Sequence, residues 1–229
     1  MKILAIGAHP DDIEIFMFGL LSVYANRGDQ IGLIVATDGA AGSVLSNTSL
    51  SNIREIETRK ALKDLGDPNL LGIPDGHLAE TANAKKIISN AIEYENPDLI
   101  ITHAPEDYHP DHRALSLFVE DIAGFKCPVI FSDTLMGVNF NPEFYIDITM
   151  FFEAKANAIM CHKTQVPERF VSATKLMNRF RAAQCNAPDF NYAEAYRVNN
   201  RFPFSDIRSL IPEPPPLKPF YQNNSNALI

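Results

Sequence analysis

Apolar residues along this chain gather in five short runs, and longer segments with helical spacing separate them. The runs cover residues 3–8, 31–37, 70–73, 99–103 and 129–132. Apolar runs of this length without alternation are typical of strands buried on both faces, as in a parallel sheet. The segments between the runs predict helices over residues 13–26, 51–65, 82–94 and 112–122. This alternation predicts the α/β class, with a Rossmann-like, open and mostly parallel sheet that carries helices on both faces.

The pattern changes in the second half of the chain. Residues 150–160 and 173–183 predict two further helices rich in Phe, Ala and Met, and no strand is expected after them. Residues 212–219 are rich in proline, which cannot join a helix or a central strand. We therefore predict a single domain over residues 1–210, followed by a Pro-rich extended tail over residues 211–229.

Composition excludes several classes of partner. The chain has 20 Lys and Arg against 28 Asp and Glu, a net charge of -8 that leaves no surplus for neutralising nucleic-acid phosphates. No stretch approaches the roughly 18 to 20 apolar residues that span a bilayer, and the first apolar run leads into polar residues rather than a cleavage site. These features predict a cytoplasmic protein without a membrane partner. The 3 cysteines are widely spaced and indicate neither a disulfide framework nor a thiolate zinc site.

Two polar clusters follow the first and the fourth apolar runs. The first is His9-Pro10-Asp11-Asp12, and the second ends in His109-Pro110-Asp111-His112. Because ligands bind beyond the carboxyl ends of parallel strands, both clusters are expected at the same edge of the sheet. Taken alone, the aspartates of either cluster are also suited to capping the helix that follows.

Taken together, the two clusters predict a metal site. His9, Asp12 and His112 supply two imidazoles and one carboxylate, a ligand set that leaves positions open for water and substrate at a catalytic zinc ion. The prediction is one Zn²⁺ per chain. The same set is the facial triad of non-haem iron(II) oxygenases, so Fe²⁺ also fits.

Two further residues of the clusters suit a metal-dependent hydrolase. Asp11 adjoins the ligand Asp12 and is placed to accept a proton from metal-bound water. His109, as an imidazolium, would stabilise an oxyanion and protonate the leaving amine. For Asp111 two interpretations stay open: its carboxylate holds the charge of His109 by a hydrogen bond, or it caps the helix.

These residues resemble a known family, the PIG-L/LmbE-like zinc-dependent deacetylases, which remove N-acetyl groups from N-acetylglucosamine compounds and include enzymes of mycothiol and bacillithiol synthesis. The resemblance rests on residues 8–14 and 108–114, with weaker similarity reaching to about residue 165. It implies the same metal ligands, Asp11 as general base and His109 as the acid or oxyanion group. It also implies that Arg54 contacts substrate, although an arginine at such a position is more often a surface group.

The function that follows is hydrolysis of the N-acetyl group of an N-acetylglucosamine-type sugar or conjugate, releasing acetate and a free amine. The alternatives are an iron(II) oxygenase and a catalytically silent sugar-binding protein. Dinucleotide binding is not expected, because no Gly-x-Gly-x-x-Gly turn follows the first run. The expected partner is a small amino-sugar substrate. The apolar second half and the Pro-rich tail favour a homo-oligomer.

Overall fold

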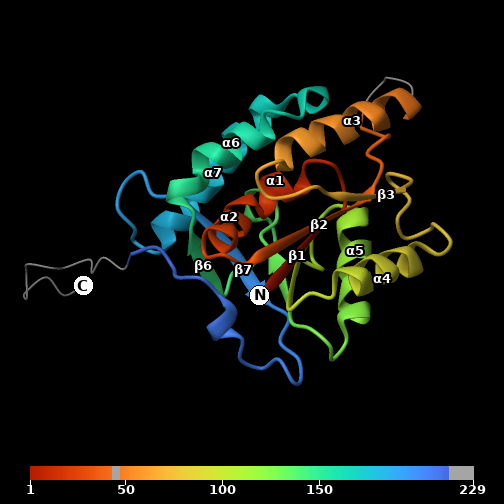
Figure 1. The fold of residues 1–229 in the computed structure, drawn as a ribbon. Helices are drawn as coiled ribbons and strands as arrows, with labels where there is room; N and C mark the ends of the chain where they lie inside the picture. The colour runs from red at the N-terminus through yellow and green to blue at the C-terminus, as the bar shows by residue number, and fades with distance from the viewer. Residues whose placement is uncertain (43–46, 217–229) are drawn as a thin grey trace, which may run out of the picture.

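The computed structural model describes residues 1–42 and 47–216, without the side chains of residues 47–49. Its centre is a seven-stranded sheet with the strand order β3-β2-β1-β4-β5-β7-β6 (Figure 1). The first five strands in this order are parallel, and β7 runs antiparallel to both β5 and β6. The strands are β1 (Lys2–Gly7), β2 (Gln30–Thr37), β3 (Asn69–Ile73), β4 (Leu99–Thr102), β5 (Val129–Ser132), β6 (Phe144–Asp147) and β7 (Ala193–Val198). The predicted mostly parallel α/β sheet is confirmed.

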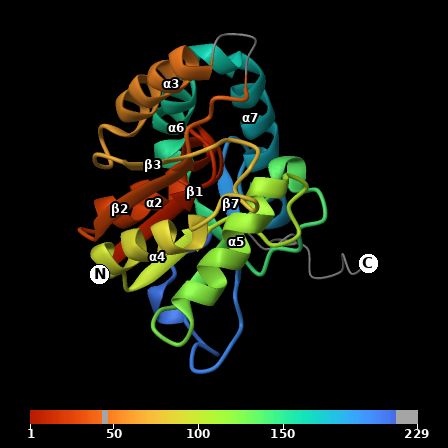
Figure 2. The same cartoon turned by 90° about the vertical axis from the view of Figure 1, so that its right-hand side faces the viewer.

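Helices cover both faces of the sheet, as the two ribbon views show (Figures 1 and 2). One face carries α4 (Ala84–Glu95) and α5 (Pro110–Ala123). The other carries α1 (Asp12–Phe16), α2 (Phe18–Asn26), α3 (Asn47–Leu62), α6 (Phe152–Ile159) and α7 (Pro167–Gln184). Each face has its own hydrophobic core, and β1 contributes to both: Ile3 and Ala5 pack into one, and Leu4 and Ile6 into the other. This two-sided burial explains why the strand reads as an unbroken apolar run.

The expectation of no strand after the last helices was wrong. β7 follows α7, and β6 precedes α6. β7 does not form an apolar run because Glu194 is its second residue, where the carboxylate is buried and pairs with Lys155 at 2.6 Å. A buried charge with a partner is compatible with a central strand but interrupts the apolar pattern.

The helix predicted over residues 13–26 is divided in two at Met17, whose φ of -131° is not helical. The Glu194 carboxylate explains the division, since it accepts hydrogen bonds from the backbone N–H groups of Gly19 at 2.9 Å and Leu20 at 2.8 Å. A carboxylate at these positions satisfies the free N–H groups that begin a helix. A Cβ atom at Gly19 would lie 2.7 Å from Glu194, so only glycine permits this close approach.

Residues 211–216 form neither helix nor strand, in keeping with the extended chain predicted for the beginning of the tail. Residues 217–229 lie outside the described residues, and the boundary between domain and tail stays a prediction. Among the described helices, none combines the length and the apolar character needed to cross a membrane.

Candidate active site

The two polar clusters meet beyond the carboxyl ends of β1 and β4, which are neighbours at the centre of the sheet. The strand order reverses at this pair, and open α/β sheets bind their ligands at such a point. A cavity of about 370 Å³ opens there. His9, Asp11, Asp12, His109 and His112 all line it, so the structure brings together the residues of both motifs.

The loop between β1 and α1 turns sharply to present its aspartates. Asp11 has a φ of 115°, in the left-handed region that few residues other than glycine adopt. Asp12 folds back so that its Oδ2 accepts the backbone N–H of His9 at 2.7 Å. The side chain of Asp11, which occupies the N-cap position, makes no capping hydrogen bond. Helix capping therefore does not explain either aspartate, and the backbone conformation of Asp11 is of the kind that proteins retain at functional sites.

The atoms proposed as metal ligands form a nearly equilateral triangle. His9 Nδ1 lies 3.2 Å from Asp12 Oδ2 and 3.2 Å from His112 Nε2, and the third side, between His112 Nε2 and Asp12 Oδ2, is 3.3 Å. Ligand atoms about 2.0–2.1 Å from a tetrahedral zinc ion stand about 3.3 Å apart. The three side chains thus fit a zinc ion without rearrangement.

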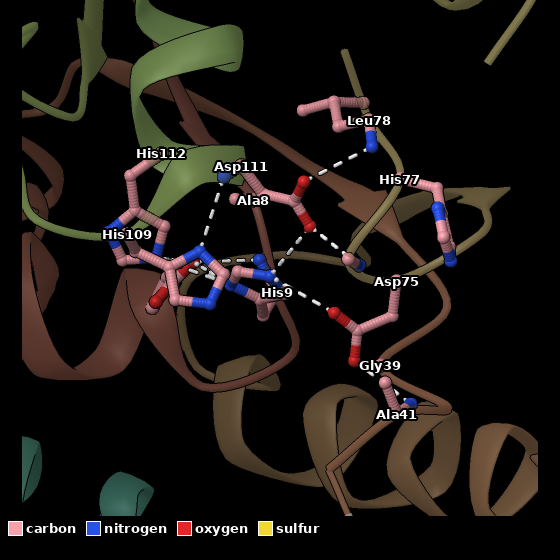
Figure 3. A network of polar contacts seen from close by, with 12 residues as sticks. Ala8, His9, Gly39, Ala41, Asp75, His77, Leu78, His109, Asp111 and His112 are labelled. Carbon is pink, nitrogen blue, oxygen red and sulfur yellow. Dashed lines mark hydrogen bonds and ion pairs between the residues drawn. The ribbon is translucent and has the colours of Figure 1, made fainter. Parts of the chain in front are cut away.

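A carboxylate lies beside the opposite nitrogen of each histidine. His9 Nε2 lies 3.2 Å from both Asp111 Oδ2 and Asp75 Oδ1 (Figure 3). His112 Nδ1 lies 3.0 Å from Asp107 Oδ2 in an ion-pair contact. A ring nitrogen that donates its proton to a carboxylate leaves the other nitrogen with a free lone pair for a metal. In this site the free nitrogens are the two that face Asp12.

The electrostatics of the cluster also favour a cation. Burial lowers the pKa of His9, but hydrogen bonds to Asp111 and Asp12 outweigh it and raise the pKa well above its usual range. Burial opposes protonation of His112 too, yet Asp12 and Asp107 raise its pKa to about 9. Burial raises the pKa of Asp12, and the neighbouring imidazoles lower it well below its usual range. Positive charge is stabilised at this point, and a metal ion takes the place of the protons when it binds.

Asp111 was expected either to hold the charge of His109 or to cap the helix, and its side chain does neither. Its carboxylate accepts the backbone N–H groups of Gly76 at 2.7 Å and Leu78 at 3.1 Å, and also contacts His9 (Figure 3). Only its backbone N–H reaches His109, whose Nδ1 accepts it at 3.2 Å. Asp111 therefore neither caps α5 with its side chain nor holds a charge on His109. It orients His9 and ties the loop after β3 to the site.

The same hydrogen bond revises the protonation expected for His109. Because Nδ1 accepts a hydrogen bond from a backbone N–H, the ring proton of the neutral form belongs on Nε2. Burial lowers the pKa of His109, and the charges of His9 and His112 lower it further. The site therefore favours a neutral imidazole with one N–H to donate, rather than the predicted imidazolium.

Arg54 is almost fully buried, with 3% of its surface exposed, and it contacts the proposed base rather than open space. Its guanidinium donates to the carbonyl oxygens of Pro10 and of Gly39, the latter at 3.0 Å, and lies 3.2 Å from Asp11 Oδ2. Burial raises the pKa of Asp11 to about 6, although Arg54 opposes the shift. Arg54 lines the cavity, but most of its donors are already engaged, so the surface role considered for it is wrong.

Sequence reasoning assigned no role to three residues of the site. His103 stacks on His112, with ring centroids 3.7 Å apart and planes 13° apart, and its Nε2 lies 3.1 Å from Asp12 Oδ2. Burial lowers the pKa of His103 to about 4. Asp75 and Asp107 orient the two histidine ligands. A signal was present for Asp107, because metal-bound histidines regularly pair with a carboxylate and Asp107 precedes the second motif by two residues. Asp75 is distant in sequence from both motifs, so proximity to a motif gives no such signal.

Comparisons with known proteins agree with the motifs. Residues 4–123 match the family described as PIG-L, GlcNAc-PI de-N-acetylase. A diacetylchitobiose deacetylase from Thermococcus kodakarensis is 26% identical over 189 residues, which cover 73% of this chain and 71% of the relative. Among solved structures, N,N'-diacetylchitobiose deacetylase from Pyrococcus horikoshii has a TM-score of 0.77 at 23% identity, over 92% of this chain and 88% of that chain.

A second solved structure shows that the fold alone does not decide which reaction a protein catalyses. The 4-carboxy-2-hydroxymuconate hydratase of Pseudomonas putida KT2440 has a TM-score of 0.77 at 18% identity, over 90% of this chain and 99% of that chain. One fold thus accommodates different reactions, and the reaction has to be argued from the site. Neither the oxygenase nor the silent sugar-binding alternative gains support from these comparisons.

Proposed function

The chain belongs to the PIG-L family of de-N-acetylases, and we propose that it is a zinc-dependent hydrolase of N-acetylglucosamine-type sugars or conjugates. It would release acetate and a free amine. The observation that carries the proposal is the triangle of ligand atoms from His9, Asp12 and His112, with sides of 3.2, 3.2 and 3.3 Å, in a cavity that Asp11 and His109 also line. The ligand donors are of the types that zinc and iron(II) both accept, and zinc is the ion proposed.

A zinc ion in this triangle would lower the pKa of a bound water to about 7 and polarise the acetyl carbonyl. The protein would place Asp11 beside that water as the general base. Asp11 would take one proton of the water as the water oxygen forms a bond to the carbonyl carbon. It would return that proton to the leaving nitrogen as the carbon–nitrogen bond breaks, so the products would be acetic acid, which ionises to acetate, and the amine.

His109 and Arg54 support this reaction in different ways. Neutral His109 would donate a hydrogen bond from its Nε2–H to the oxygen of the former carbonyl as negative charge develops there. Arg54 would hold the Asp11 carboxylate in position through the 3.2 Å contact between them. The resemblance implied a substrate contact for Arg54. Its Nε is buried and has no partner among the described residues, so such a contact would have to come from the part of Arg54 that lines the cavity.

The test is an activity assay with a small panel of N-acetylglucosamine conjugates that differ in the group attached to the sugar. Protein stripped of metal with a chelator is assayed for acetate and free amine, before and after zinc is restored, and without oxygen. We expect no activity in the stripped protein and full activity with zinc in anaerobic buffer. An activity that required oxygen would contradict hydrolysis and would favour the oxygenase.

Asp11→Asn tests the role of the base without changing a metal ligand, because the amide keeps the shape of the side chain but does not act as a base. We expect it to bind zinc and to lose roughly 10²- to 10⁴-fold in kcat, the usual contribution of general acid–base catalysis. A variant with undiminished turnover would show that another residue is the base. Asp67→Asn, an exposed aspartate on the surface, is the matched control.

A further inference from the structure

His103, at the end of β4, is buried beside the proposed metal ligands, and the proposed mechanism makes no use of it. Its side chain is 1% exposed. One face of its ring stacks on His112 at 3.7 Å, and Phe16 packs edge-on against it with centroids 5.7 Å apart. The histidine ligand therefore has an aromatic wall along its face, which limits the rotation of its ring.

The Nε2 atom of His103 connects the two strands that carry the site. It accepts the backbone N–H of Ala8 at 3.1 Å. In the pairing of β1 with β4, Ile3 lies opposite Leu99 and Ala5 lies opposite Ile101. The bond between Ala8 and His103 therefore lies beyond the last paired residues. It holds the loop that begins at His9 against the end of β4, and the two motifs keep a fixed relation to each other.

The same Nε2 also lies 3.1 Å from Asp12 Oδ2. A backbone N–H can only donate, so Nε2 uses its lone pair for Ala8 and carries no proton to offer Asp12. Two acceptors at this distance repel each other. A cation at Asp12 Oδ2 withdraws charge from that oxygen and removes the repulsion, so this contact favours the metal-bound site.

The other nitrogen of the ring shows that packing alone does not account for histidine here. Nδ1 is buried and has no hydrogen-bond partner among the described residues. A buried polar atom without a partner is unfavourable, and it calls for an explanation in terms of function. Phenylalanine would fill the same space without this atom, but it would leave the Ala8 N–H unpaired.

We propose that His103 is a positioning residue that pre-organises Asp12 and His112 for the metal ion. The inference rests on the metal centre of the proposed function. Its ring fixes the plane of His112, and its Nε2 fixes the loop of Asp12 while making the metal-free site unfavourable. Its expected contribution is to metal affinity, because residues that orient metal ligands typically affect affinity by 10- to 100-fold.

Two substitutions separate the two contacts of His103. His103→Phe keeps the ring that stacks on His112 and loses the acceptor, whereas His103→Gln keeps an acceptor for Ala8 and loses the ring. Zinc affinity is measured by competition with a chromophoric chelator, and the site is also examined through the visible spectrum of the Co²⁺-loaded protein. We expect both variants to bind zinc roughly 10- to 100-fold more weakly and to show an altered cobalt spectrum.

A melting experiment distinguishes positioning from ordinary packing. At a fixed zinc concentration, the rise in the melting temperature of the wild type grows with the logarithm of its zinc affinity. This rise should shrink in both variants, whatever their melting temperature without metal. His77→Gln, which alters an exposed histidine paired with Glu80, should keep the full rise. If both His103 variants bind zinc as tightly as the wild type, His103 only packs. If the wild type binds no divalent cation, the metal centre itself is wrong.

Discussion

The carboxylates of Glu194 and Asp12 are both buried, but they differ in what their surroundings leave unsatisfied. Each oxygen of Glu194 accepts two hydrogen bonds. Oε1 accepts Lys155 Nζ at 2.6 Å and one backbone N–H of α2, and Oε2 accepts Tyr196 OH at 2.6 Å and another. The lysine balances the charge, so the cluster is closed and its role is to fix the start of α2 against β7.

The cluster around Asp12 is open by comparison. Asp12 Oδ2 accepts one backbone N–H, but the imidazoles of His9, His103 and His112 all approach it within 3.3 Å. No Lys or Arg side chain among the described residues forms an ion pair with Asp12. Ligand atoms thus converge on one buried point, where the imidazoles of His9 and His112 carry the positive charge when no metal is bound. A metal ion can replace those protons. Burial and charge alone therefore do not identify a site, whereas the convergence of these atoms does.

The largest effect should come from replacing the open carboxylate. Asp12→Asn removes one charge and keeps the shape, so the triangle of ligand atoms loses its anionic member. We expect zinc binding to be lost and kcat/KM to fall by roughly 10⁴-fold, at the upper limit for one catalytic group. Circular dichroism should show a folded protein, because the amide oxygen of asparagine can still accept the backbone N–H of His9. An active, zinc-binding variant would contradict the ligand assignment.

The closed cluster should respond in the opposite way. Glu194→Gln leaves the buried ammonium of Lys155 without a counter-charge, and breaking such a pair costs about 3–5 kcal/mol of stability. Urea unfolding measures the loss, and the zinc affinity of the folded fraction should match that of the wild type. Glu153→Gln, at an exposed position of α6, is the control with an effect near zero. A large change in zinc affinity in Glu194→Gln would show that the two clusters are coupled.

The contrast between these clusters also explains which parts of the fold were readable from the sequence. The five parallel strands were found because each contains an apolar run, and in the interior strands such as β1 both faces are buried. The helices of the second half were found with shifted ends: α7 begins at Pro167, earlier than the predicted residue 173. β7 was missed because the buried Glu194 near its start is satisfied by residues distant in sequence, and periodicity does not record such partners.

For the site, the motif residues were identified but their partners were not. The atoms of His9, Asp12 and His112 lie within 3.3 Å of one another, as a shared ligand requires. The Asp111 carboxylate makes neither of the two contacts that were left open for it. Asp111 instead contacts His9. The loop after β3 packs beside the start of α5, and the spacing of residues within the motif does not reveal this packing. Sequence distance indicates which residues share an edge of the sheet, and only the packed structure decides which atoms face each other.

A smaller effect tests whether Arg54 positions the base or binds the sugar. Arg54→Lys keeps the positive charge but cannot reach Pro10, Gly39 and Asp11 together. If Arg54 positions Asp11, kcat should fall by up to about 10²-fold, as small misplacements of catalytic groups do, with little change in KM. If it contacts substrate, as the resemblance implies, KM should rise instead. Arg59→Lys, on the same helix and at the surface, should change neither constant.

The smallest effect concerns a buried ion pair next to the open site. His162 Nε2 lies 2.8 Å from Glu14 Oε1, and both side chains are buried. Burial lowers the pKa of His162, but Glu14 raises it more, so the folded-state pKa lies above the usual 6.5. Below pH 6.5, His162 is protonated in both the folded and the unfolded state, and the pair contributes its full stability. As the pH rises from 6.5 through the raised pKa, the folded state holds more protons than the unfolded state, and the contribution is lost.

His162→Gln should remove this part of the pH dependence, because the amide fills the same space and does not titrate. The measurement is urea unfolding from about pH 6 to 9, with the difference in slope between wild type and variant as the readout. The variant should be less stable than the wild type at the acidic end, and the two should converge as the pH rises. A constant difference at every pH would mean that the imidazole stays neutral and that the pair is held by an uncharged hydrogen bond.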